Sequence, residues 1–151
     1  MRLWRISEHA DLSGEGGLRF SGRWHSRGSR IVYLSDHPAS ALVESLVHLE
    51  IDREDVPDSY QLLAVDIPDD FHFASIEEKQ LNAQWRAQLA ETRALGDRWL
   101  RDDQAALLRV PSALVPFASN WLLNPAHADT ARVRVAEIIR ALFDRRLFGA
   151  G

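Results

Sequence analysis

The sequence of 151 residues contains no cysteine. This absence excludes disulfide bonds, thiolate nucleophiles and zinc sites that use cysteine ligands. Six histidines are present, but none is followed by another histidine four residues later, which is the spacing of a helical metal site. We therefore expect no catalytic metal.

Long apolar runs are also missing. The first ten residues carry charged side chains at positions 2, 5 and 8 and contain no apolar block, so they do not resemble a secretory signal. The longest uncharged run, 110–128, is interrupted by three prolines and two asparagines, and such a segment would leave backbone groups unsatisfied in lipid. These features predict a soluble protein that does not bind a membrane.

Basic residues are not in excess, because 18 lysines and arginines stand against 22 acidic residues and give a net charge of -4. This balance disfavours a nucleic-acid-binding surface. The glycine-rich segment GEGGLRFSG lacks the Gly-Lys-Ser/Thr ending of a phosphate-binding P-loop, which excludes a P-loop ATPase. Ser112 is not part of a GxSxG motif, so a nucleophilic triad is disfavoured.

Strand-like and helix-like segments alternate without a regular period, and the sequence has no internal repeat. This pattern predicts a single α+β domain over 1–151, with a mixed sheet and flanking helices. We expect strands at 3–6, 31–34, 60–67, 105–115 and near 132–136, the third of them following an acidic, solvated loop. We expect a helix from a cap at Ser35 or Asp36, a helix over 76–100 broken near Gly96, and a helical turn at 120–124. Four tryptophans are expected in the core: Trp24, Trp85, Trp99 and Trp121.

Positive charge is concentrated in one segment. Between Leu18 and Ser35 the chain carries Arg19, Arg23, Arg27 and Arg30 together with His25 and no acidic residue. A local positive patch on an acidic protein indicates a small anionic ligand, although a solvated loop with ordinary surface arginines is equally compatible with the spacing.

Two further residues near this patch suggest a chemistry. Tyr33 lies in the strand that follows, and Glu44 lies on the helix side opposite the leucines, where it either lines a cleft or is simply exposed to solvent. Arginine binds phosphate oxygens, an aromatic ring stacks on a flat leaving group, and a carboxylate stabilises an oxocarbenium-like sugar. Cleavage of the nicotinamide–ribose bond of NAD needs all three.

The chain also carries a series of motifs in a fixed order. They are GRWHSRGSRIVYLSDHPASALVESLVHL at 22–49, LGDRWL at 95–100, RVPSALVP at 109–116, NWLLNP at 120–125 and FDRRLF at 143–148. Together they resemble the RES domain family over nearly the whole chain. The resemblance implies a cytoplasmic toxin of a bacterial type II toxin–antitoxin pair, with a fold similar to ADP-ribosyltransferase toxins and NAD as substrate. It also implies an antitoxin partner whose helix-turn-helix (Xre-like) chain covers the cleft.

The resemblance places the arginine, tyrosine, glutamate and serine of the family on Arg23, Tyr33, Glu44 and Ser112, with Asn120 beside them. We expect Arg23 to hold the diphosphate, Tyr33 to stack on nicotinamide or its ribose, and Glu44 to bind ribose hydroxyls and stabilise the developing cation. Ser112 is expected to orient Glu44 or the substrate. His25 stands where many relatives have asparagine and is a candidate ligand contact, as is Arg19, while Arg27 and Arg30 are weaker candidates.

The acceptor of the ADP-ribosyl group is left open at this stage. Water would make the protein an NAD glycohydrolase, inorganic phosphate would make it a phosphorylase, and a protein side chain would make it a mono-ADP-ribosyltransferase. In one branch of the family the target is phosphoribosyl pyrophosphate synthetase. A non-catalytic module that binds an anion or an acidic segment of a partner is the alternative.

Overall fold

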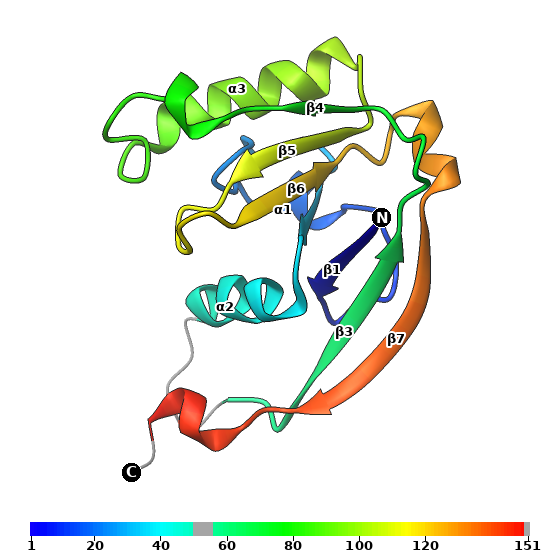
Figure 1. The fold of residues 1–151 in the computed structure, drawn as a ribbon, viewed down its shortest axis with the longest axis vertical. Helices are drawn as coiled ribbons and strands as arrows, with labels where there is room; N and C mark the ends of the chain where they lie inside the picture. Colours follow the sequence, from blue (N-terminus) through cyan, green and yellow to red (C-terminus); the bar gives the residue numbers. More distant parts are fainter. Residues whose placement is uncertain (50–55, 150–151) are drawn as a thin grey trace.

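The computed structural model describes residues 1–49 and 56–149. Its centre is a seven-stranded sheet in the order β4-β5-β6-β2-β1-β3-β7 (Figure 1). The strands are β1 (Arg2–Ile6), β2 (Val32–Ser35), β3 (Ser59–Asp66), β4 (Phe73–Ser75), β5 (Leu107–Pro111), β6 (Ser119–Leu123) and β7 (Arg134–Leu142). β4 pairs with β5 in parallel, and the other neighbouring strands are antiparallel.

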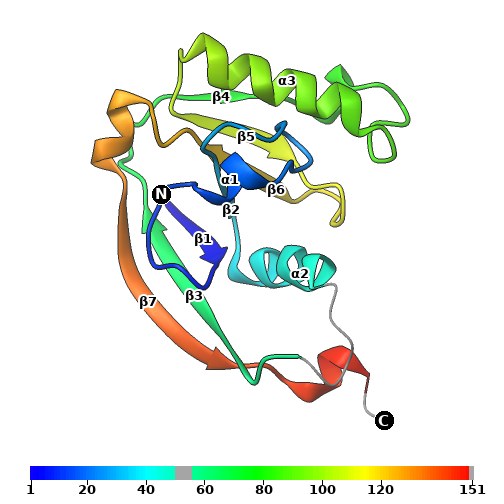
Figure 2. The same ribbon diagram turned by 180° about the vertical axis from the view of Figure 1, so that it is seen from behind.

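Three α-helices accompany the sheet: α1 (Gly16–Arg19), α2 (Pro38–His48) and α3 (Leu89–Asp102). Three 3-10 turns, η1 (Glu78–Gln80), η2 (Ala128–Arg132) and η3 (Arg145–Phe148), lie between or after the strands. α3 runs along β4 and β5, whereas α2 lies near β1 and β2 (Figures 1 and 2). The predicted α+β class with a mixed sheet is confirmed.

Two hydrophobic clusters lie on opposite faces of the sheet, because side chains alternate along each strand. One cluster takes residues from both halves of the sheet, including Leu3 and Leu63 on one side and Val32, Leu34 and Leu123 on the other. β3 and β7 run obliquely to β5 and β6 (Figure 1), and this twist brings the two halves together over a common core.

The second cluster lies between the sheet and α3. It contains Ile31, the tryptophans Trp24, Trp85 and Trp99, and the strand residues Leu108, Val110 and Leu122, and the partly buried Tyr33 packs against it. Ile31 and Tyr33 therefore face α3, whereas Val32 and Leu34 belong to the cluster on the other face of the sheet. The four predicted core tryptophans are at most 8% exposed.

Gly96 is the point of closest approach between α3 and the loop that carries Trp24. A Cβ atom at this position would lie 1.6 Å from the Trp24 carbonyl oxygen. Three hydrogen-bonding residues of α3 hold the same loop: Thr92, Arg93 and Asp97. The glycine therefore permits a helix to lie directly on a backbone, and the break that we expected at Gly96 does not occur.

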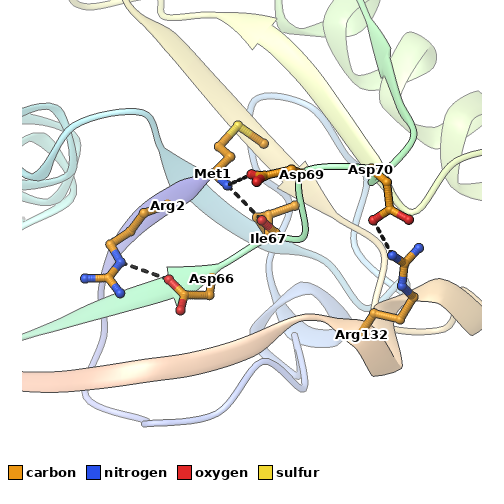
Figure 3. Close-up of polar contacts among 7 residues, drawn as sticks. All are labelled: Met1, Arg2, Asp66, Ile67, Asp69, Asp70 and Arg132. Carbon is orange, nitrogen blue, oxygen red and sulfur yellow. Dashed lines mark hydrogen bonds and ion pairs between the residues drawn. The ribbon is translucent and has the colours of Figure 1, made fainter.

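Polar contacts fix the start of β1 against the end of β3 (Figure 3). The Met1 nitrogen lies 2.9 Å from the Ile67 carbonyl oxygen and 2.9 Å from Asp69 Oδ1, and Arg2 Nε lies 2.9 Å from Asp66 Oδ1. These groups are largely exposed, so water screens the ion pairs and they add little to stability. They align a strand whose register with β3 runs from Arg2–Asp66 to Ile6–Leu62.

Several predicted elements are confirmed and others are wrong. The strands at 3–6, 31–34 and 60–67 correspond to β1, β2 and β3, but β5 is shorter than 105–115 and β7 extends well beyond 132–136. The segment 120–124 is strand β6 rather than a helical turn. The helix expected over 76–100 is reduced to η1 and α3. Part of the acidic loop, 50–55, lies outside the described residues.

The cap of α2 is neither Ser35 nor Asp36. His37 occupies the N-cap position, where its Nδ1 accepts a hydrogen bond from the Ala39 amide at 3.1 Å, and Pro38 begins the helix. Ser35 is instead the last residue of β2, and Asp36 accepts a hydrogen bond from the Ser119 amide. In the described part of the chain, no helix has the length and apolar character needed to cross a bilayer.

Candidate active site

A single carboxylate oxygen joins three elements of the fold. Glu44 lies on α2, and its Oε1 accepts hydrogen bonds from Ser112 Oγ at 2.9 Å and from Asn120 Nδ2 at 2.7 Å. Ser112 follows β5 and Asn120 lies in β6, so the turn between these strands lies beside α2 (Figures 1 and 2). The structure thus brings together three of the residues that the sequence singled out.

The two donors are themselves held in place. Ser112 is buried, and its Oγ accepts the amides of Leu114 and Val115 at 3.1 Å each, so its own proton points to Glu44. Asn120 lies opposite Ser35 in the β2–β6 register, and Ser35 Oγ lies 3.4 Å from Asn120 Oδ1. Within 1–49 and 56–149, no protein atom hydrogen-bonds Glu44 Oε2. One carboxylate oxygen is therefore fixed, and the other has no hydrogen-bond donor among the residues that the structure describes.

Arg23 is held by backbone carbonyls instead of acidic side chains. Its terminal nitrogens donate to the Trp85 carbonyl at 3.4 Å and the Arg86 carbonyl at 3.0 Å, and its guanidinium lies 5.8 Å from the centre of the Trp85 ring. Partial burial lowers the pKa of Arg23, while attraction to Glu44 opposes that shift. Glu44 is thus near enough to act electrostatically on Arg23, yet the two form no ion pair.

Tyr33 and His25 form a buried hydrogen-bonded pair. The Tyr33 hydroxyl lies 2.8 Å from His25 Nδ1 and accepts the Trp24 amide at 3.2 Å, while His25 Nε2 lies 2.9 Å from the Phe20 carbonyl oxygen. A carbonyl can only accept, so Nε2 carries the proton and Nδ1 accepts from the tyrosine. Burial lowers the pKa of His25 and raises the pKa of Tyr33. The tyrosine hydroxyl is used inside the protein, which leaves its half-buried ring as the part that can meet a ligand.

Tyr33 and His25 pack so closely against Gly22 that no side chain fits at that position. A Cβ atom at Gly22 would lie 2.3 Å from the Tyr33 hydroxyl oxygen and 2.9 Å from His25 Nδ1. His25 is only 3% exposed, with both ring nitrogens occupied. The structure therefore buries His25 behind Tyr33 and the loop, and a direct contact of His25 with a ligand stays a prediction.

The remaining arginines of the loop lie apart from these residues. Arg19 is exposed at the end of α1. Arg30 donates to the Ser13 carbonyl at 3.2 Å and lies 3.4 Å from Glu15. Arg27 and Arg30 line a hollow of about 740 Å³ whose lining does not include Arg23, Tyr33 or Glu44. The structure divides the predicted positive patch into two regions.

Three residues of α3 complete the site but were not singled out from the sequence. Thr92 Oγ1 donates to the Arg23 carbonyl at 2.7 Å, and Arg93 Nε donates to the Gly22 carbonyl at 2.8 Å. Asp97 accepts both the amide and the hydroxyl of Ser26, at 2.8 Å and 2.6 Å. A possible signal was the helical spacing of Thr92, Gly96 and Trp99, which are all buried on one face.

The site contains the fixed carboxylate of Glu44 and the partly desolvated guanidinium of Arg23. An oriented carboxylate stabilises developing positive charge, and a guanidinium binds phosphate oxygens through paired hydrogen bonds. Because the two side chains form no ion pair with each other, both remain available to a ligand that carries opposite charges at its two ends.

Comparison with known proteins identifies the family of the chain. The model of the RES domain family matches residues 2–144. The chain belongs to the RES domain family. A Pseudomonas putida protein named "Toxin Res" is 48% identical to this RES domain over 98% of the chain and 100% of the relative. A Sphingobium protein named "Prs ADP-ribosylating toxin" is 34% identical over 96% and 95% of the two chains.

A solved structure shares the fold of this RES domain. A chain of the Mycobacterium tuberculosis MbcT–MbcA toxin–antitoxin complex aligns with a TM-score of 0.75 over 97% of this chain and 86% of that chain. The identity is 17%, so the likeness concerns the fold alone. The predicted family and the α+β architecture are both confirmed.

Proposed function

We propose that this RES domain protein is a cytoplasmic toxin that cleaves the nicotinamide–ribose bond of NAD and transfers ADP-ribose to an acceptor. The observation that carries the proposal is the Glu44 carboxylate, which Ser112 and Asn120 hold by one oxygen within electrostatic reach of Arg23. The names of the Pseudomonas and Sphingobium relatives support a toxin and ADP-ribose transfer.

The proposed reaction begins with rupture of the bond between the nicotinamide nitrogen and the ribose C1′ carbon. The bonding electron pair leaves with nicotinamide, and an oxocarbenium-like ribose develops beside Glu44. The free Oε2 of Glu44 would accept from a ribose hydroxyl, while Arg23 binds the diphosphate. The Tyr33 ring would pack on the nicotinamide or its ribose. A lone pair of the acceptor then forms the new bond at C1′, and the acceptor loses its proton.

Ser112 and Asn120 act as positioning residues in this scheme, because both donate to Glu44 Oε1. His25 has the same kind of role for Tyr33, since its Nδ1 accepts a hydrogen bond from the tyrosine hydroxyl. NAD is the substrate, and no step of the scheme uses a metal.

Release of nicotinamide from NAD tests the proposal. Glu44→Gln keeps a carbonyl oxygen that accepts from Ser112 and Asn120, so the fold is preserved while the negative charge is lost. We expect nicotinamide release to fall by ~100-fold or more. Arg23→Gln should also lower nicotinamide release. Arg98→Gln, on an exposed residue of α3, is the matched control and should keep full activity. Unchanged turnover in Glu44→Gln contradicts the site assignment, and a wild-type protein that releases no nicotinamide with any acceptor favours a non-catalytic binding module.

The acceptor is proposed to be a protein side chain. The name of the Sphingobium relative supports this choice and suggests phosphoribosyl pyrophosphate synthetase as a target to test. Intact-mass measurement of that enzyme after incubation should show the gain of an ADP-ribosyl group. Accumulation of free ADP-ribose or its 1-phosphate instead would assign water or phosphate as the acceptor.

An antitoxin partner is the last part of the proposal. The shared fold with a chain of the MbcT–MbcA complex supports such a partner. We propose a helix-turn-helix (Xre-like) antitoxin that covers the site, while this chain itself does not bind nucleic acid. Co-expression with the neighbouring gene product should abolish nicotinamide release and yield a stable complex.

A further inference from the structure

Two half-buried arginines approach the same stretch of loop without an acidic partner. Arg23 is in the loop and Arg93 is on α3, where its Nε donates to the Gly22 carbonyl at 2.8 Å. In the part of the chain that the structure describes, neither guanidinium lies within 4.0 Å of a carboxylate. A charged side chain that is partly removed from water normally needs such a partner or a ligand.

We propose that Arg93 is a second diphosphate-binding arginine, which acts with Arg23 on the same dinucleotide. The inference rests on the proposed function and extends it, because it assigns a residue of α3 to substrate binding.

Hydrogen bonds fix Arg93 next to the backbone of Arg23. Thr92, its neighbour, is fully buried and donates its hydroxyl to the Arg23 carbonyl at 2.7 Å, so α3 contacts two successive loop carbonyls. Arg93 uses Nε for this contact. Its two terminal nitrogens have no protein acceptor among the residues described, and they carry four N–H groups that remain available to an anion.

The charges around the site agree with this role. Burial is the main cause of the lowered pKa of Arg23, and repulsion by Arg86 and by Arg93 acts in the same direction, so Arg93 is near enough to act on Arg23. Two like charges held together in a partly desolvated site raise the free energy of the empty protein, and a bound anion removes that repulsion. Arg86 is different, because its guanidinium pairs with Glu78 at 2.7 Å and lies over the Trp85 ring at 4.6 Å.

The ligand must carry more than one negative group for both arginines to act. A diphosphate has one negative charge on each phosphate at neutral pH, and a guanidinium fits phosphate oxygens through two parallel hydrogen bonds. Arg23 and Arg93 would then each bind one phosphate, with Glu44 reserved for the ribose at the nicotinamide end.

Binding of ligands with and without a diphosphate distinguishes a diphosphate-binding role of Arg93 from a purely structural role. We expect Arg93→Gln to weaken binding of ADP-ribose by about tenfold or more, since the variant loses a charge-assisted hydrogen bond to a phosphate. Nicotinamide riboside, which has no phosphate, should bind Arg93→Gln as it binds the wild type. Arg98→Gln is the control and should bind both ligands normally. Binding is measured by calorimetry, with the melting temperature followed for every variant.

A second variant keeps the test decisive if Arg93→Gln is unstable. Arg93→Lys retains the charge but not the paired geometry, so we expect a higher KM for NAD with kcat changed less than twofold. Equal ADP-ribose affinity in Arg93→Gln and wild type, or an equal loss for both ligands, would overturn the role of Arg93 alone. A wild-type protein that neither binds ADP-ribose nor releases nicotinamide would overturn the proposed function and this inference with it.

Discussion

Gly96→Ala is the substitution for which helix propensity and the structure predict opposite results. Gly96 lies inside α3, and replacing glycine by alanine in a helix interior normally stabilises a protein by about 1 kcal/mol. Here the new Cβ atom would lie 1.6 Å from the Trp24 carbonyl oxygen, whereas real Cβ contacts are essentially never closer than 3.0 Å. The helix and the loop must therefore separate by more than an ångström.

The size of the effect follows from the contacts that this separation strains. Four hydrogen bonds join α3 to the loop, from Thr92, from Arg93 and, twice, to Asp97. Each contributes roughly 0.5–1.5 kcal/mol, and more where a charged group takes part. Losing half of them costs about 3 kcal/mol, which exceeds the gain in propensity and leaves a net destabilisation of about 2 kcal/mol.

Thermal and urea unfolding measure this difference. For a chain of this length, 2 kcal/mol corresponds to a decrease in Tm of about 4–8 °C. Gly16→Ala is the matched control, since Gly16 is also helical and a Cβ atom there would meet nothing within 4 Å. Gly16→Ala should not destabilise the protein, and it should gain up to about 1 kcal/mol from helix propensity. A Gly96→Ala protein as stable as the wild type, or more stable, would refute the reasoning.

Two further predictions concern the hydrogen bonds of the site. Burial lowers the pKa of His25, so the unfolded chain binds a proton more readily than the folded chain, and stability should fall as pH decreases below about 6.5. His25→Gln should reduce this pH dependence of Tm; an unchanged profile would mean that another group causes it. Ser112→Ala removes a donor to Glu44 and the acceptor of two amides, so we expect a loss of about 1–3 kcal/mol in the free energy of unfolding and lower nicotinamide release. Full activity in this variant would show that Asn120 alone orients the carboxylate.

Local sequence patterns predicted the elements that are amphipathic on their own. β2 alternates between two buried clusters, and β1 and β3 contain the β-branched and aromatic residues typical of strands. The segment 120–124 was wrongly predicted to be helical, because Trp121, Leu122 and Leu123 are all buried and a strand inside the sheet shows no alternation of apolar and polar residues. Its neighbours on both sides, rather than its own residues, determine its conformation.

The contacts within the candidate site also depend on the fold and are not visible in local sequence patterns. The residues Arg23, Glu44 and Ser112 were selected from a family resemblance, but the meeting of Glu44 with Asn120 depends on the β2–β6 register. Nothing in the spacing of Arg93 and Gly22 indicates that they touch, because the two residues are 71 positions apart in the sequence. Contacts between residues about 70 positions apart require the fold.

The two hydrogen bonds to Glu44 have a consequence for protein synthesis. Both donors come from residues after position 110, so a nascent chain that ends earlier contains Glu44 and Arg23 but cannot orient the carboxylate. The proposed activity would therefore switch on late, when the ribosome has already made most of the polypeptide. Truncated translation products should be inert.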